Sequence, residues 1–90
     1  MKKAPISLQD LRRRLYLKAK ATRVWDDDNY ILWEDREDES GEMRWHAIGL
    51  VDDVLLLVVH AYRRKRHGKE IIRIISARKA RKSESAAYFQ

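Results

Sequence analysis

The apolar run at residues 54–63, "VLLLVVHAYR", constrains the fold of this chain more than any other segment. Its six leading aliphatic residues leave no polar face, so a strand here must be covered on both sides. The run is far too short to span a bilayer. Asp52 and Asp53 precede it where a tight turn belongs, and Gly68 lies in the turn-like segment 64–69 that follows. The run therefore predicts the central strand of a sheet, with a hairpin at each end.

Three other segments have the character of strands. "MRWHAIGLV" at residues 43–51 alternates between an apolar and a partly polar face, and "EIIRIIS" at residues 70–76 sets one arginine among isoleucines. "YILWE" at residues 30–34 predicts a short strand. The acidic segment at residues 35–42, with Gly41 as its turn residue, predicts a solvated loop. Together these segments predict a four-stranded antiparallel meander.

A helix is predicted on each side of the meander. Ser7 is a plausible N-cap for the first helix. Leu8, Leu11 and Leu15 recur at helical spacing, and we expect this stripe to cover one face of the sheet. The first helix should end near residues 26–29. The last helix is expected over residues 78–90, so the chain reads as one α+β domain spanning residues 1–90.

Residue usage excludes several kinds of site. The chain has no cysteine, which excludes disulfides and thiolate ligands and fits a reducing compartment. The N-terminal segment lacks the apolar stretch of a signal peptide, so we expect a cytoplasmic protein without a membrane segment. His46 and His60 could face each other across a hairpin, but no histidine pair has the close spacing of metal ligands. We therefore expect no metal and no cofactor.

Charge is distributed in three blocks along the chain. Residues 1–25 carry eight basic residues and one acid, for a net charge of +7. Residues 26–53 carry two arginines and eleven acids, for a net charge of −9. Residues 54–90 carry ten basic residues and two acids, for a net charge of +8. The basic blocks are compatible with a polyanionic partner, and equally with the solvated faces of two helices and a hairpin.

Arginine is the most informative polar residue in the predicted sheet. Arg73 lies inside the apolar last strand, Arg78 follows at the end of that strand, and Arg44 and Arg63 come from the two preceding strands. Guanidinium groups on adjacent strands can bind phosphates with planar, bidentate geometry. The alternative is that these arginines form ion pairs across the sheet. The acids available for such pairs are Glu34, Glu42 and Glu70.

The predicted last helix adds a carboxylate and a phenol. Ala80, Glu84 and Tyr88 recur at i, i+4 and i+8, so they would share one helical face. A carboxylate and a phenol beside an arginine cluster resemble the parts of a phosphoryl-transfer site. The alternative is a helix that packs through Ala80, Ala87 and Tyr88, with Glu84 in a salt bridge.

Three segments of the chain resemble the BrnT family of bacterial toxins, which belong to type II toxin–antitoxin pairs. The resemblance covers roughly residues 22–89. Within it, the order of the segments, their spacing and the identity of their residues agree with the family pattern. Its most specific parts are "GEMRW" at 41–45, "VVHAYR" at 58–63 and "RIISARKA" at 73–80, followed by Glu84 and Tyr88.

The resemblance implies a RelE-like fold and a ribonuclease activity that arrests translation. It also implies a BrnA-like antitoxin that neutralises the toxin and carries the contact with operator DNA. For cleavage without a metal, Arg63 and Arg78 would stabilise the phosphorane charge, and Glu84 or His60 would transfer protons. The residues expected to bind the RNA substrate are Arg44, Arg73, Tyr88 and Lys79.

The N-terminal third departs from the family pattern, because the chain has no initial strand of the "FEWD" type and no Lys-His pair. One alternative is therefore a degenerate toxin that binds the antitoxin without cutting RNA. Another, suggested by the basic blocks alone, is a plain nucleic-acid-binding protein. A missing strand would also leave a sheet edge open, so we expect a homodimer or an obligate complex with the antitoxin.

Overall fold

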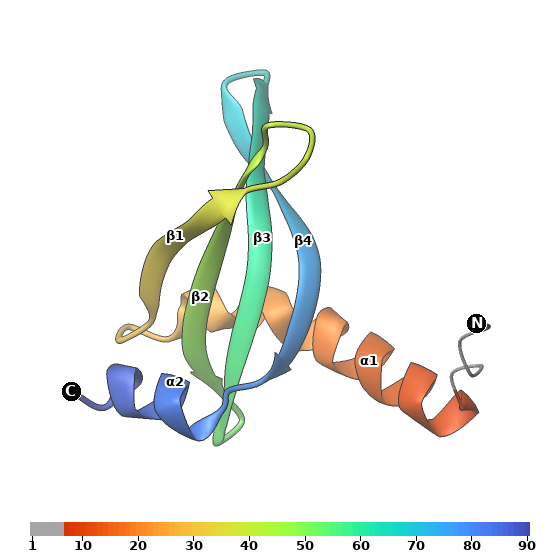
Figure 1. Ribbon diagram of the computed structural model, residues 1–90, viewed down its shortest axis with the longest axis vertical. Coiled ribbons are helices and arrows are strands. Elements are labelled where there is room, and N and C mark those ends of the chain that lie inside the picture. The colour runs from red at the N-terminus through yellow and green to blue at the C-terminus, as the bar shows by residue number, and fades with distance from the viewer. Residues whose placement is uncertain (1–6) are drawn as a thin grey trace.

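The computed structural model describes residues 7–90, except for the side chains of residues 63–66 and 70 (Figure 1). The four strands form one antiparallel sheet in the order β1-β2-β3-β4. The elements in chain order are α1 (Leu8–Lys20), the 3₁₀ helix η1 (Ala21–Asp26), β1 (Ile31–Glu37), β2 (Met43–Val51), β3 (Val54–Arg66), β4 (Lys69–Lys79) and α2 (Lys82–Tyr88). The predicted α+β fold, a four-stranded antiparallel sheet with a helix at each end, is confirmed.

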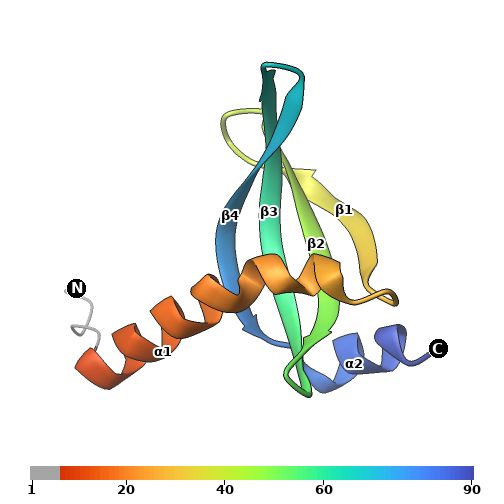
Figure 2. The same cartoon turned by 180° about the vertical axis from the view of Figure 1, so that it is seen from behind.

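The helical segment α1–η1 lies across one face of the sheet, while α2 lies at the lower end of the sheet on the other side (Figures 1 and 2). Leu17, Ala21 and Val24 follow one another at i, i+4 and i+7, so they form a single buried stripe. This stripe packs on four sheet residues to form the main core. Those sheet residues are Ala47 and Val51 of β2 and Leu56 and Val58 of β3.

β3 is covered on both faces, as the apolar run predicted. Leu56 and Val58 belong to the core beneath α1–η1. Leu57 and Ala61 alternate with them, point to the other face and are also buried. A continuous apolar sequence is thus accommodated at an inner position of the sheet.

The leucine stripe of α1 does not cover the sheet, and that prediction is wrong. Leu8, Leu11 and Leu15 are 63%, 43% and 59% exposed. At 100° per residue these leucines lie on nearly the opposite side of the helix from Leu17, which faces the sheet. The stripe that packs against the sheet starts only where α1 reaches the strands, since the first turns of the helix extend beyond β4 (Figure 2). The predicted N-cap is confirmed, because Ser7 Oγ accepts a hydrogen bond from the Asp10 amide.

The β2–β3 turn is where the paired aspartates predicted it. Asp52 and Asp53 both adopt positive φ, at 50° and 64°, as a two-residue turn between twisted strands requires. The Asp52 carboxylate accepts hydrogen bonds from the Lys20 ammonium and the Arg23 guanidinium. These bonds, chiefly those from Arg23, lower the pKa of Asp52. The turn therefore also fastens the α1–η1 junction to the end of the sheet.

Several element boundaries differ from the sequence predictions. β1 continues to Glu37, so the acidic loop is shorter than residues 35–42. β3 and β4 extend into the predicted 64–69 turn, because the ladder between them continues to the pairing of Arg66 with Lys69. The last helix, α2, is shorter than the predicted residues 78–90, because Arg78 and Lys79 are still paired with β3. Cross-strand pairing therefore overrides helix propensity at the end of β4.

No helix in the described range 7–90 is long and apolar enough to cross a membrane.

Gly49 allows η1 to approach β2 closely. A Cβ atom at this position would lie 2.7 Å from the carbonyl oxygen of Val24 and 2.8 Å from its Cγ1. Only a hydrogen at this position leaves room for the backbone of η1. The close approach brings Val24 into full burial on the sheet.

We expect Gly49→Ala to lower the free energy of unfolding by about 1–3 kcal/mol, because the added methyl overpacks the contact with Val24. Urea denaturation followed by circular dichroism measures the effect. Ser76→Ala on the exposed side of β4 is the control and should change stability by less than about 0.5 kcal/mol. Adding Val24→Ala should not restore stability, because the carbonyl oxygen still obstructs the methyl. Unchanged stability of the single variant would contradict this account of the packing.

Candidate functional site: an arginine face of the sheet

The sheet face opposite α1 gathers three of the arginines identified from the sequence. We call the surface formed by Arg44, His46, Arg73 and Arg78 the arginine face. Arg44 and His46 come from β2, where alternate residues share a face. Arg73 and Arg78 come from β4 and pair with Ala61 and Leu57 of β3, which point away from α1. Of these two β3 residues, Ala61 is small, whereas Leu57 is a large and fully buried side chain.

A bulge in β4 places Arg73 and Arg78 together. The two residues are five positions apart, so in a regular strand they would point to opposite faces. The register shifts between the pairs Val59–Ser76 and His60–Ile74, which leaves Ile75 as the extra residue. Both arginines then point to the same side as Val59 and Ala61. The sequence alone did not reveal this bulge.

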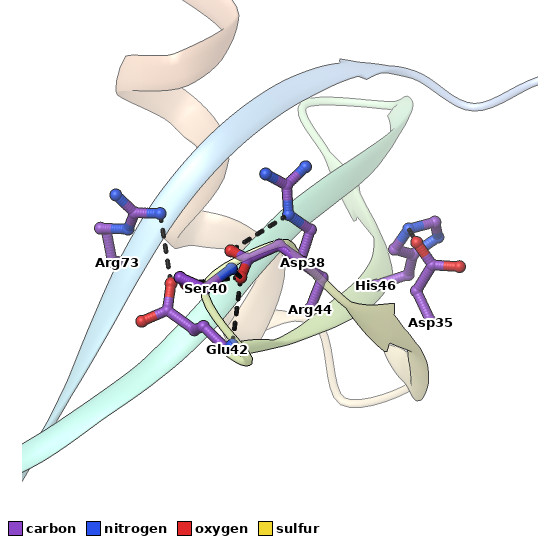
Figure 3. Close-up of polar contacts among 7 residues, drawn as sticks. All are labelled: Asp35, Asp38, Ser40, Glu42, Arg44, His46 and Arg73. Atoms are coloured by element: carbon purple, nitrogen blue, oxygen red, sulfur yellow. Dashed lines mark hydrogen bonds and ion pairs between the residues drawn. The ribbon is translucent and has the colours of Figure 1, made fainter.

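Arg73 forms an ion pair with Glu42, and its guanidinium lies 3.2 Å from the carboxylate (Figure 3). Glu42 is one of the three acids that the sequence offered as ion-pair partners for the arginines of the sheet. The Arg73 side chain is 46% exposed, and ion pairs this exposed contribute about 0–1 kcal/mol to stability. A phosphate could therefore replace the carboxylate with little loss of stability.

Arg44 is held more loosely. Its Nε atom lies 3.9 Å from the Asp38 carboxylate and, among the described residues, is buried without a hydrogen-bond acceptor (Figure 3). The Asp38 carboxylate itself accepts hydrogen bonds from the Ser40 hydroxyl and from the amides of Ser40 and Glu42. These bonds, chiefly that from the Ser40 hydroxyl, lower the pKa of Asp38. Asp38 thus organises the β1–β2 turn and leaves the Arg44 guanidinium only partly satisfied.

His46 lies on the same strand and face as Arg44. Its Nε2 atom is 3.3 Å from the Asp35 carboxylate (Figure 3). Its ring also packs edge-on against that of Trp33, with the ring centroids 5.3 Å apart. An imidazole with a carboxylate partner and an exposed edge is suited to proton transfer. In the sequence, His46 was notable only as a possible metal ligand. The two-residue spacing from Arg44 was the signal that could have placed it here.

Arg78 and Glu84 form the tightest pair on this face. The two guanidinium nitrogens donate to the two carboxylate oxygens of Glu84, each at 2.8 Å. Glu84 also accepts a hydrogen bond from the Arg81 amide at the start of α2. The Arg78 guanidinium is the main cause that lowers the pKa of Glu84 to about 2. Such a carboxylate is a weak base, so its clearest role here is to fasten α2 to β4.

His60 does not lie on the arginine face. It is fully buried on the α1 side of β3, with its ring 4.9 Å from Trp25 and 5.2 Å from Tyr62. Burial lowers the pKa of His60, so the ring is neutral at pH 7. A side chain without exposed surface cannot contact RNA in this conformation, which argues against the predicted proton transfer by His60.

Two further candidates also lie apart from this face, and one lies outside the described side chains. The Tyr88 hydroxyl donates to Asp27, which also accepts from the Leu50 amide, so Tyr88 ties α2 to the sheet. Lys79 pairs with Leu56 and therefore points to the α1 side. The backbone of Arg63 pairs with Ile71 in the β3–β4 ladder, but its side chain lies outside the described part of the chain.

Within the residues that the structure describes, no group of three or more histidine, aspartate or glutamate side chains converges in a way that could hold a metal ion.

Comparison with known protein families identifies the family of this chain. The family model described as "Ribonuclease toxin, BrnT, of type II toxin-antitoxin system" matches residues 7–84. The match includes α1 and all four strands, and it ends at Glu84. It therefore begins earlier than the resemblance noted from the sequence, which started at about residue 22. No individual curated protein matches the chain.

We expect Glu84→Gln to lower the free energy of unfolding by about 1–2 kcal/mol at pH 7, because the charged hydrogen bonds to Arg78 and the Arg81 amide weaken. The folded-state pKa of about 2 lies below the ordinary 4.5. The stabilisation is therefore complete above pH 4.5 and is lost as the pH falls towards 2. Urea denaturation across this window measures both effects.

Glu39→Gln is the matched control, since Glu39 is exposed in the β1–β2 turn. It should change neither the free energy of unfolding at pH 7 nor the loss of stability as the pH falls from 4.5 towards 2. If Glu84→Gln loses as much stability between pH 4.5 and 2 as the wild-type chain does, the pair with Arg78 does not stabilise the fold.

Proposed function

Because this chain belongs to the BrnT family of ribonuclease toxins of type II toxin–antitoxin systems, we propose that it is a metal-independent endoribonuclease that arrests translation. A toxin of a type II system has an antitoxin as its partner. We propose that this partner is BrnA-like and that any contact with operator DNA is made through it. The observation that carries the proposal of RNA cleavage is the arginine face, to which Arg44 of β2 and Arg73 and Arg78 of β4 come from the two sides of β3.

The arginines would bind the scissile phosphate and stabilise its charge. Arg44 and Arg73 flank Ala61 from the two neighbouring strands, and both are more than a third exposed. Their carboxylate partners lie at 3.9 and 3.2 Å, so a phosphate can replace them. Arg78 adds positive charge at the lower end of the face. Donors aimed at the developing charge of a phosphorane lower the barrier to its formation.

Proton transfer is best assigned to His46. Cleavage that uses the 2′-hydroxyl requires a base for that hydroxyl and an acid for the leaving 5′-oxygen. His46 is partly exposed on the arginine face and is oriented by Asp35. His60 is buried on the other side, and Glu84 is held as a carboxylate by Arg78. We retain Arg63 as a further candidate for the charge role.

A degenerate toxin that binds the antitoxin without cutting RNA is the second candidate. It is favoured by the pairing of each arginine on the face with a carboxylate, which partly neutralises the site. The absent Lys-His pair of the N-terminal segment points the same way. RNA cleavage by the purified chain separates the two candidates.

Arg73→Ala and His46→Gln should each reduce the rate of RNA cleavage. For Arg73→Ala we expect a reduction of roughly 10²–10³-fold, which is the usual effect of removing one group that stabilises transition-state charge. Gel electrophoresis of a labelled RNA measures the rate. Each variant should also relieve the growth arrest caused by expression of the chain alone. Arg12→Ala, on an exposed turn of α1 away from the sheet, is the control. If wild-type chain, variants and control are equally inactive while folded, the degenerate-toxin candidate is correct.

RNA cleavage should survive excess EDTA, because the proposed mechanism uses only arginine and histidine side chains. The same cleavage assay, run with and without chelator, measures this. Circular dichroism in EDTA checks that the fold is retained. Activity that disappears with chelator and returns with Zn²⁺ or Mg²⁺ would replace this mechanism with metal-assisted hydrolysis.

A further inference from the structure

The first turns of α1 extend past β4, which is an edge strand of the sheet (Figures 1 and 2). In the described sheet β4 pairs with β3 on one side and with no strand on the other. Its outer edge therefore presents backbone amides and carbonyls that can accept another strand. Leu17, where α1 packs on the core, lies nine residues after Leu8. That stretch of helix is about 13 Å long, more than the strand spacing of about 4.8 Å.

A groove runs between this extended part of α1 and the end of β4. The helix contributes Arg13, Arg14 and Lys18 to its wall, together with a single acid, Asp10. The apolar residues that line it are Leu17, Ile75 and Ala77, and Ser76 with the basic Arg78 and Lys79 completes the lining. The groove thus combines an apolar lining with a basic rim and lies beside an open strand edge.

We propose that this groove binds an extended acidic segment of a partner protein, which adds to the edge of β4 as a fifth strand. Alternate side chains of such a strand would point towards α1, where acids meet Arg13, Arg14 and Lys18. The backbone of the segment would satisfy the amides and carbonyls of the β4 edge. The inference deepens the proposed function, because neutralisation of a toxin requires a protein partner, but it does not depend on RNA cleavage.

A peptide fits the groove better than RNA does. An RNA backbone supplies phosphate oxygens for the arginines, but it cannot match the alternating donors and acceptors of a strand edge. No aromatic side chain lines the groove, whereas sites for single-stranded RNA stack bases on aromatic rings. The apolar residues Leu17, Ile75 and Ala77 suit aliphatic side chains of a strand instead.

A second copy of α1 fits poorly for reasons of charge. The helix carries five basic residues and one acid, so two copies brought together would repel each other. An acidic segment is attracted by the same charges, and the attraction would also speed its association. The complementary charge is therefore what identifies the occupant as an acidic strand.

The test is an NMR titration of the ¹⁵N-labelled full chain with a defined probe. The probe is a ten-residue peptide that alternates Glu with Val and is acetylated and amidated at its ends. We expect shifts confined to amides of β4 and the first half of α1. Arg13→Glu with Arg14→Glu should weaken binding by about tenfold or more. Arg12→Glu is the control for each single reversal, Arg13→Glu or Arg14→Glu, because it makes the same charge change on the same helix outside the groove, and it should weaken binding much less than either.

A second peptide, N-methylated at alternate residues, keeps every charge but cannot pair as a strand, and it should not bind. Equal binding of both peptides would mean charge attraction without strand addition and would overturn the proposal. Absence of shifts at millimolar peptide would do so as well.

A single-stranded RNA that binds the groove and loses affinity in the Arg13/Arg14 variant, while the peptide does not bind, would assign the groove to RNA. Concentration-dependent shifts without any ligand would assign it to a second copy. RNA cleavage by the Arg13/Arg14 variant is measured in parallel, so failure of the groove and failure of the ribonuclease proposal are distinguishable.

Discussion

The need to cover β3 on both faces determines most of this structure. Leu56 and Val58 are buried beneath α1–η1, and Leu57 and Ala61 are buried on the opposite side. A strand of this composition is stable only at an inner position, so β2 and β4 must flank it. The helical cover is correspondingly tight, because Gly49 lets the backbone of η1 approach β2. In a domain of 90 residues there is little other core to compensate for a loss of this packing.

The charged groups are arranged around that core, whereas the neutral His60 is buried within it. The sheet face away from α1 carries Arg44, Arg73 and Arg78, and each has a carboxylate partner of different strength. The pair of Arg78 with Glu84 is bidentate and joins α2 to β4, so it has a structural role. The other two pairs are longer, at 3.9 Å for Arg44 and 3.2 Å for Arg73 against 2.8 Å for Arg78, so their arginines can exchange a carboxylate for a phosphate. This gradation separates the part of the face that supports the fold from the part suited to a substrate.

The same sheet offers two distinct surfaces for the two kinds of partner that the family implies. The arginine face has planar cations and an imidazole around small residues, an arrangement suited to a phosphodiester. The groove beside β4 has apolar residues, a basic rim and an open backbone edge, an arrangement suited to a peptide strand. If both assignments are correct, an antitoxin strand in the groove would lie along the outer edge of β4 and would meet the arginine face only at Arg78, which lines both surfaces. Neutralisation would then require a further segment of the antitoxin on that face, or a change in β4 that both sites share.

The sequence by itself determined the elements, their order and the turn at Asp52 and Asp53, because alternation, apolar runs and turn residues are local signals. It also brought Arg44 and Arg73 to notice as arginines on adjacent strands. It could not show that Arg73 and Arg78 share a face, since that depends on the bulge at Ile75, which arises from pairing with β3. Nor could it show that His60 is buried, that His46 lies partly buried beside Asp35, or that the leucines of α1 point away from the sheet. These properties depend on which face of each element meets another, and only the packing of the whole chain decides that.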